Sequence, residues 1–162
     1  MLRIVVLVLA ASVSLAAGEP RGIEPKADRR MYSVTSFTNA LALGATLVTA
    51  AEARRVFGSA LRPGVVAVEV GFYSKLQNGF PVRLSDFALL PDKKTAKRSV
   101  RPMAPAEVVD LFRAASPAEK TLPEVAAARA IAGYLFFQVD GPLGALALDY
   151  TGNGTWLTLP LD

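Results

Sequence analysis

The segment GVVAVEVGFY, residues 64–73, constrains the fold of this chain more than any other stretch. Its large apolar residues recur at every second position and so share one face of an extended chain: Val66, Val68, Val70 and Phe72. The other face carries smaller residues and Glu69, which we expect to lie in solvent. A strand with one apolar face needs a second layer to cover it, so this segment predicts a layered β domain.

Further strand-like segments lie before and after it. Residues 32–48 predict one or two strands, with a break near Asn39 or Gly44. Residues 82–90 predict another strand, whose alternation is imperfect around Ser85-Asp86 as at a bulge or an edge. The last third of the chain predicts a meander of three strands, at residues 134–139, 145–150 and 155–161. About seven strands with short turns predict a mainly β fold, a two-sheet antiparallel sandwich.

Two or three short helices are expected between these strands. The clearest is TAAEARRVFG, because Thr49 followed by Glu52 forms a capping box and Gly58 suits the helix end. Residues 104–115 also have helical spacing, with apolar residues on one side and charged residues on the other.

The stretch after this second helix is less regular. Residues 116–121 are expected to form a loop. The alanine-rich segment 123–132 fits a helix that starts at Pro123, and it fits a lead into the next strand equally well. The sequence leaves both alternatives open.

The first sixteen residues predict a cleavable signal peptide. Arg3 supplies a positive charge, residues 4–13 are apolar, and Ser14-Leu15-Ala16 places small residues at the −3 and −1 positions of a cleavage site. An uncleaved membrane anchor is the weaker alternative, because a spanning helix needs roughly 20 apolar residues. We expect no transmembrane segment after cleavage. No cysteine follows the apolar run, which excludes lipid attachment of the bacterial lipoprotein kind.

Residues 17–30 are polar, with two prolines, two glycines and no apolar period. We expect a flexible leader there, followed by a single domain over residues 31–162.

The chain contains no histidine and no cysteine. The absence of histidine removes the usual general base near neutral pH, the Ser-His and Cys-His nucleophile systems, and common zinc and copper ligands. We expect no cofactor. A secreted domain without disulfides must be stabilised by its core alone. Because eukaryotic secreted β domains commonly carry disulfides, the expected location is a bacterial periplasm or the cell exterior.

The closing segment DYTGNGTWLTLPLD partly matches a calcium-binding loop. Residues at positions 1, 3, 5 and 6 of such a loop are Asp149, Thr151, Asn153 and Gly154. The pattern then needs a glutamate at position 12, where this chain has Pro160, and it needs a helix on each side, where this chain alternates leucines. We therefore expect a β-hairpin turn and no metal. Tyr150 and Trp156 flank the turn and are expected to pack as a cross-strand pair.

Five cations lie within nine residues after the strand predicted at 82–90: Lys93, Lys94, Lys97, Arg98 and Arg101. On a chain of formal net charge +4, this basic cluster would attract an anionic partner such as lipopolysaccharide or a membrane surface, or it is only a solvated loop. No aromatic residue is interleaved to stack on bases, so nucleic acid is not the expected partner. Arg54 and Arg55 would extend the cluster if the two segments meet in space.

Paired carboxylates are the one catalytic apparatus that we consider, as in glycoside hydrolysis. Asp110, Asp140 and Asp149 are available, but the last two adjoin turns, where aspartate has a structural reason to occur. Asp86 is the acid to inspect, because it interrupts a strand next to Phe87. A hydrogen bond to the backbone at a strand end is the simpler explanation even there, so we assign no catalytic residue.

The order of the segments also carries a resemblance. A signal peptide is followed by ALALGATLVTAAEARRVFGSAL, GVVAVEVGFYSKLQNGFPVRLSDFALL, GYLFFQV and a final LTLPL hairpin. This order resembles that of uncharacterised exported bacterial domains with an Ig-like sandwich, in which a V-x-V-x-V strand precedes a D-F-x-L strand and a G-Y-L-F-F strand comes late. The likeness covers most of residues 31–162 and implies an Ig-like fold, with no catalytic residues to transfer.

The expected function is that of an exported, non-enzymatic Ig-like module that binds a protein or an anionic component of the cell envelope. Two alternatives stay open. A carboxylate-based hydrolase acting on a polysaccharide would show a pocket in which two acids converge, one of them buried with a raised pKa. A structural subunit of an envelope assembly would show an unpaired hydrophobic edge or a large apolar patch.

Overall fold

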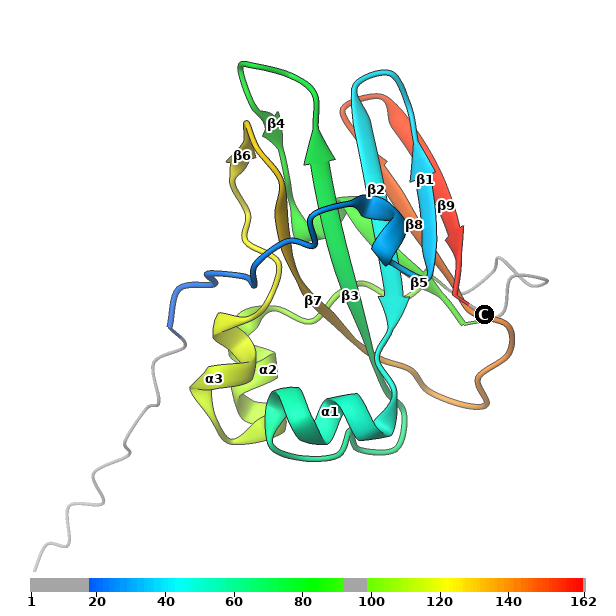
Figure 1. The fold of residues 1–162 in the computed structure, drawn as a ribbon. Helices are drawn as coiled ribbons and strands as arrows, with labels where there is room; N and C mark the ends of the chain where they lie inside the picture. The colour runs from blue at the N-terminus through cyan, green and yellow to red at the C-terminus, as the bar shows by residue number, and fades with distance from the viewer. Residues whose placement is uncertain (1–17, 92–98, 162) are drawn as a thin grey trace, which may run out of the picture.

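The computed structural model describes residues 18–91 and 99–161. The protein is mainly β, with antiparallel pairs of strands and a few short helices (Figure 1). Within the described residues, the strands form a four-stranded, a three-stranded and a two-stranded sheet.

The four-stranded sheet has the order β1-β2-β3-β7, and its strands span Val34–Phe37, Leu41–Leu47, Val65–Ser74 and Ile131–Gln138. The long central strand β3 is the segment predicted from its alternation. The break between β1 and β2 falls at Asn39, one of the two places expected. Thr38 fixes this turn, since its Oγ1 accepts hydrogen bonds from the amides of Ala40 and Leu41 at 3.3 and 3.2 Å.

The three-stranded sheet has the order β5-β8-β9, and its strands span Phe87–Leu90, Ala147–Gly152 and Thr155–Pro160. The predicted meander of three strands is therefore wrong. Its first strand, β7, pairs with β3 in the other sheet, and residues 139–146 cross from one sheet to the other.

The two-stranded sheet pairs β4 (Phe80–Pro81) with β6 (Ala126–Ala127). Residues 82–90 are thus not one strand. The chain changes partner from β6 to β8 within this segment, and a 3₁₀ turn, η2 (Leu84–Asp86), redirects it where the alternation was imperfect. The segment 123–132 forms β6 and the lead into β7, so the strand alternative is confirmed and the helix is wrong.

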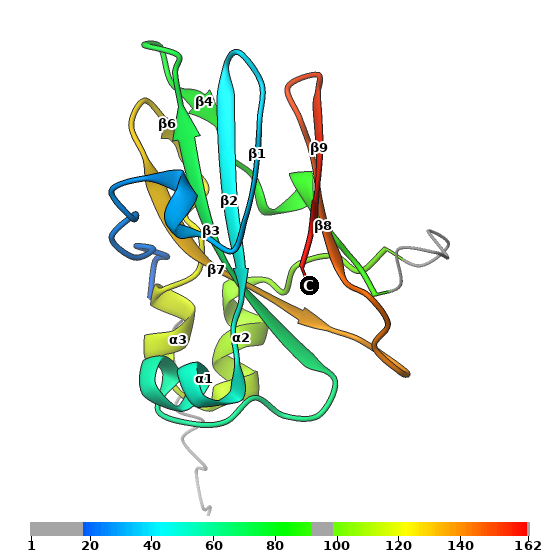
Figure 2. The same cartoon turned by 45° about the vertical axis from the view of Figure 1, so that its right-hand side comes forward.

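The main core lies between the four-stranded and three-stranded sheets, which face each other (Figure 2). Val66, Val68, Val70 and Phe72 of β3 point into it, as predicted. Buried side chains of the opposite sheet meet them: Phe87, Leu89, Leu148, Tyr150, Leu157 and Leu159.

Three helices cover the other face of the four-stranded sheet at one end (Figure 1): α1 (Ala50–Phe57), α2 (Pro105–Phe112) and α3 (Ala115–Glu119). They form a second apolar cluster in which Ala67, Tyr134 and Phe136 of the sheet are buried. The loop predicted at 116–121 is wrong over most of its length, because α3 occupies it. Within the described residues, no helix has the length and hydropathy that crossing a membrane requires.

The start of α1 confirms the predicted capping box. The Thr49 Oγ1 accepts from the Glu52 amide at 3.3 Å, and the Glu52 carboxylate accepts from the Thr49 amide at 2.9 Å. Gly58 ends the helix with a left-handed φ of 76°.

The rest of that outer face is crossed by residues 18–31, which we call the strap. Its backbone pairs with β7 through Ile23 and Ala132, and its Lys26 forms an ion pair with Glu69 at 3.2 Å. The carbonyl of Lys26 accepts a hydrogen bond from the Tyr73 hydroxyl at 2.7 Å. The sequence had suggested a flexible leader and a solvated Glu69. Instead the strap is held against the sheet by the Lys26–Glu69 ion pair and by hydrogen bonds of its backbone. Sequence patterns detect apolar spacing, so they do not reveal polar contacts of this kind.

Candidate functional site

The closing segment forms the predicted hairpin. Asn153 and Gly154 make its turn with positive φ values of 50° and 73°, the backbone that a two-residue turn requires. Asp149, the first residue of the partial calcium pattern, accepts a hydrogen bond from Thr158 Oγ1 across the hairpin at 2.6 Å. The described residues contain no group of three or more acidic, histidine or cysteine side chains placed to hold a metal ion.

The expected packing of Tyr150 on Trp156 is wrong. The two-residue turn pairs Tyr150 with Leu157 and Trp156 with Thr151, so the two aromatic residues lie on opposite faces of the sheet. Tyr150 is buried against Phe87, whereas the Trp156 side chain is 72% exposed.

Only one residue of the predicted basic cluster lies in the described part of the chain. Lys93, Lys94, Lys97 and Arg98 fall outside it. Arg101 is described, and its guanidinium forms two hydrogen bonds to the carboxylate of Glu107 on α2, at 2.9 and 2.8 Å. These hydrogen bonds, together with one from the Ala104 amide, lower the pKa of Glu107 to about 2. Arg101 therefore stabilises the start of α2. Arg54 and Arg55 lie exposed on α1.

Asp86, the acid singled out from the sequence, lies at the end of η2 beside the β8–β9 hairpin. A Cβ added to Gly152 would overlap the Tyr150 hydroxyl and would lie 2.8 Å from Asp86 Oδ2, so these two oxygens flank the same small space. Burial raises the pKa of Asp86; the charge of Arg83 opposes this and that of Glu124 adds to it. The Tyr150 hydroxyl is fully buried and has no hydrogen-bond partner among the described residues.

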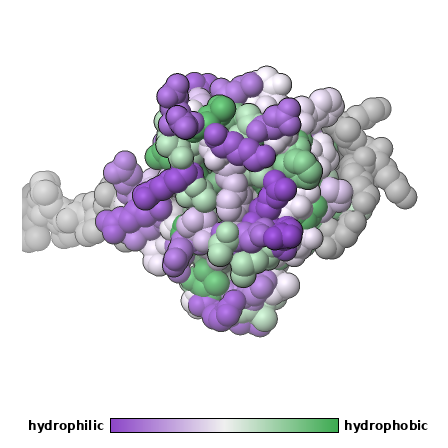
Figure 3. Space-filling view, turned by 45° about the horizontal axis from the view of Figure 1, so that its top comes forward, coloured by the Kyte–Doolittle hydropathy of each residue, from purple (hydrophilic) through white to green (hydrophobic). Residues whose placement is uncertain are grey.

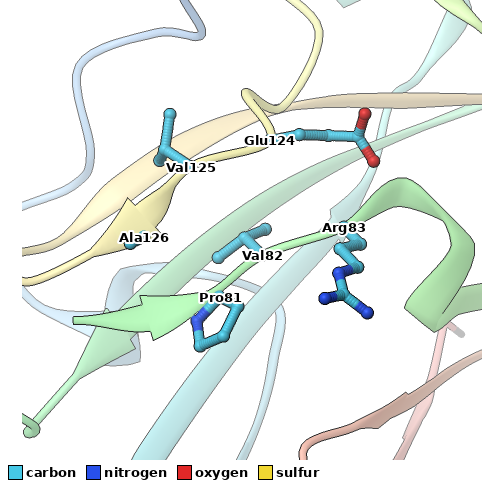
Figure 4. A pocket seen from close by; sticks show the side chains of 6 residues that line it. All are labelled: Pro81, Val82, Arg83, Glu124, Val125 and Ala126. Carbon is cyan, nitrogen blue, oxygen red and sulfur yellow. The ribbon is translucent and has the colours of Figure 1, made fainter.

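A groove lies beside this corner, over the paired segments β4 and β6 (Figure 4). It is shallow and open to solvent, with a volume of about 400 Å³, and the residues that line it are Pro81, Val82, Arg83, Glu124, Val125 and Ala126. The floor is mostly apolar, with one cation and one anion. Glu124 is held in place because its Oε1 accepts a hydrogen bond from the Leu84 amide at 2.8 Å.

A second groove, of about 260 Å³, shares Glu124 and Val125 with the first. Its other lining residues come from the strap, from η2 and from the chain around α2 and α3: Glu19, Pro20, Leu84, Pro105, Leu122 and Pro123. The Glu124-Val125 dipeptide thus lines both grooves. We call this surface the double groove.

Sequence reasoning missed Arg83, Glu124 and Val125. They come together because β4 pairs with β6, two strands more than 40 residues apart in the chain and only two residues long. Neither strand has an alternation long enough to recognise.

Exposed apolar residues also occur elsewhere, including Met31, Phe37, Leu143 and Trp156. On the face seen in Figure 3, apolar side chains form separate small areas among polar ones.

No protein-family model and no curated protein matches this chain. Among solved structures, it is similar to "a putative lipoprotein (ycdA)" from Bacillus subtilis subsp. subtilis str. 168, with a TM-score of 0.50 and 16% sequence identity. The match covers 79% of this chain and 38% of that protein, so this chain spans about two fifths of the neighbour's length. At this identity the likeness shows the fold alone.

Proposed function

We propose that this chain is an exported, non-enzymatic module with an Ig-like β-sandwich that binds a protein of the bacterial cell envelope, in the periplasm or outside the cell. The predicted signal peptide supports export. The description of the structural neighbour as a lipoprotein fits an envelope-associated protein. This chain has no cysteine to carry a lipid, so the fold would be shared and the lipid anchor would not.

The observation that carries the binding function is the double groove. Ligand sites are concave and mostly apolar, with a few fixed polar groups, and usually measure about 300–1,000 Å³. The first groove has an apolar floor, an anion held by a backbone amide, and a cation on the facing segment (Figure 4). Two neighbouring grooves that share one dipeptide suit an extended segment of a partner, with one apolar side chain in each groove and polar groups facing Arg83 and Glu124.

Site-specific crosslinking tests this function. A photoreactive residue replaces Val125, which is 44% exposed and lines both grooves, and the protein is irradiated in envelope extract. The control places the same residue at Leu143, which is 49% exposed and lies outside the double groove. We expect one protein to be captured from position 125 and lost when Glu124→Arg is added. Equal capture from both positions would contradict the proposal.

A carboxylate-based hydrolase acting on a polysaccharide remains a second candidate, because one observation favours it. Asp86 has a pKa raised by burial, and the charge of Glu124 acts on it in the same direction. In such an enzyme one acid acts on the pKa of the other in this way, although Asp86 itself lines neither groove. If the protein releases reducing ends from envelope polysaccharides, Asp86→Asn should abolish the release and Asp110→Asn should not. No release by the unaltered protein would remove this candidate.

A further inference from the structure

The second groove differs from the first in the charges of its lining. It contains two glutamates, Glu19 and Glu124, and no lysine or arginine. In the whole chain, 18 lysines and arginines outnumber 14 aspartates and glutamates, so a groove lined by acids alone departs from the overall balance of charge. The first groove, in contrast, has Arg83 as well as Glu124 in its lining. The second groove therefore presents negative charge that no cation of its own lining neutralises.

Both carboxylates belong to segments that hydrogen bonds hold in place. The Glu124 Oε1 accepts a hydrogen bond from the Leu84 amide at 2.8 Å. Glu19 lies on the strap, two residues before Arg21, whose amide donates to the carbonyl of Glu119 at 2.7 Å. A site whose charged groups are already positioned loses less conformational entropy when a partner binds.

Cations elsewhere in the described part of the chain leave these two carboxylates unpaired. Each of the ion pairs that the described residues form joins other side chains. The Arg83 guanidinium points away from the Glu124 carboxylate (Figure 4). Lys26, the lysine of the strap, is paired with Glu69 at 3.2 Å. A cation that neutralises the groove has to come from a partner.

The rest of the lining is apolar: Pro20, Leu84, Pro105, Leu122, Pro123 and Val125. Proline has no amide hydrogen, so three of these residues add no backbone donor that could bind the carboxylates. Lysine and arginine side chains cover apolar surface with their methylene stems while their charged ends meet polar groups. An apolar groove with two carboxylates and no cation matches this combination, whereas a purely aliphatic side chain would leave the carboxylates unpaired.

We propose that the second groove binds a lysine or arginine side chain of the extended segment that a partner places there. This inference rests on the proposed function and specifies the chemistry of the partner. The stem of the side chain supplies the apolar contact that the proposed function assigns to this groove, and its charged end meets Glu19 and Glu124. Complementary charge of this kind favours one partner over others.

The test uses two small probes, acetyl-lysine methylamide and acetyl-norleucine methylamide, which share the apolar stem and differ in the ammonium group. Each is titrated into isotope-labelled protein without its predicted signal peptide, and NMR follows the amide resonances of Leu122 and Val125. We expect the lysine probe to bind more tightly. Glu19→Gln should weaken it about two- to fivefold, as for an exposed ion pair, and should leave the norleucine probe unchanged. Glu24→Gln is the matched control, because Glu24 is exposed on the same strap and lines neither groove.

Equal affinities of the two probes, or no binding of the lysine probe, would overturn the inference. Equal weakening by Glu19→Gln and Glu24→Gln would overturn it as well, since the effect would then be one of general charge. The probes need no envelope extract, so this failure is distinct from that of the proposed function. Capture from position 125 without a preference for lysine would end this inference alone. A preference for lysine without any capture would support it and contradict the proposed function.

Discussion

Replacing Tyr150 by phenylalanine is predicted to leave the protein at least as stable as before, which is unusual for a change at a fully buried residue. The Tyr150 ring is 0% exposed and packs against Phe72 and Phe87, with ring centroids 5.9 and 5.0 Å away. Phenylalanine keeps these contacts. Burial raises the pKa of Tyr150 to about 12, and the nearby Asn153 side chain opposes this rise. No described residue has hydrogen-bond geometry to the hydroxyl, so its removal breaks no well-formed hydrogen bond.

The size of the effect follows from the cost of burying a polar group. An unsatisfied buried donor costs about 1–3 kcal/mol. Tyr150→Phe should therefore raise the free energy of unfolding by an amount between zero and about 3 kcal/mol. Urea unfolding at pH 7 measures it, followed by far-ultraviolet circular dichroism because the exposed Trp156 is a poor probe of the core.

Tyr73→Phe is the matched control for this prediction. The Tyr73 hydroxyl donates to the carbonyl of Lys26 at 2.7 Å, so its removal should lower the free energy of unfolding by about 0.5–1.5 kcal/mol. If Tyr150→Phe instead loses 1 kcal/mol or more with an unchanged m-value, then Asn153, Asp86 or a bridging water satisfies the Tyr150 hydroxyl, and the prediction is refuted.

Three further predictions concern the packing of Tyr32 on β3, the α2 cap and the hairpin. Gly71→Ala should cost about 1–3 kcal/mol in urea unfolding, because a Cβ there would overlap the ring of Tyr32; no loss would contradict this packing. The Arg101 bond lowers the pKa of Glu107 from 4.5 to about 2, so its stabilisation is present above pH 4.5 and is lost as the pH falls towards 2. Because both side chains are exposed, this stabilisation is below about 1 kcal/mol. The difference in the free energy of unfolding between the unaltered protein and Glu107→Gln should therefore shrink as the pH falls from 4.5 towards 2. Trp156→Ala should change stability by less than about 0.5 kcal/mol, whereas a larger loss would mean that the indole is packed.

The elements that the sequence predicted well are those whose cause is local. The capping box of α1 needs only Thr49 and Glu52, three residues apart. The last hairpin needs only Asn153 and Gly154 to turn the chain. Strand β3 is long enough for its alternation to be unmistakable.

The elements that were missed depend on distant partners. β4 and β6 exist because each finds the other across the fold, and η2 exists because the chain changes partner there. The faces of Tyr150 and Trp156 were within reach of sequence reasoning. A two-residue turn at Asn153-Gly154 places Tyr150 opposite Leu157, and alternation then sends Tyr150 and Trp156 to opposite faces.

The residues of the candidate site also divide into those with a local cause and those that depend on a distant partner. Asp86 was identified because it interrupts a local pattern, and its pKa is indeed raised by burial. Glu124 and Val125 lie in the alanine-rich segment 123–132. Its sequence fits a helix and a lead into a strand equally well, and it contains no motif that indicates a site. They line a groove together with Arg83 only because β6 pairs with β4.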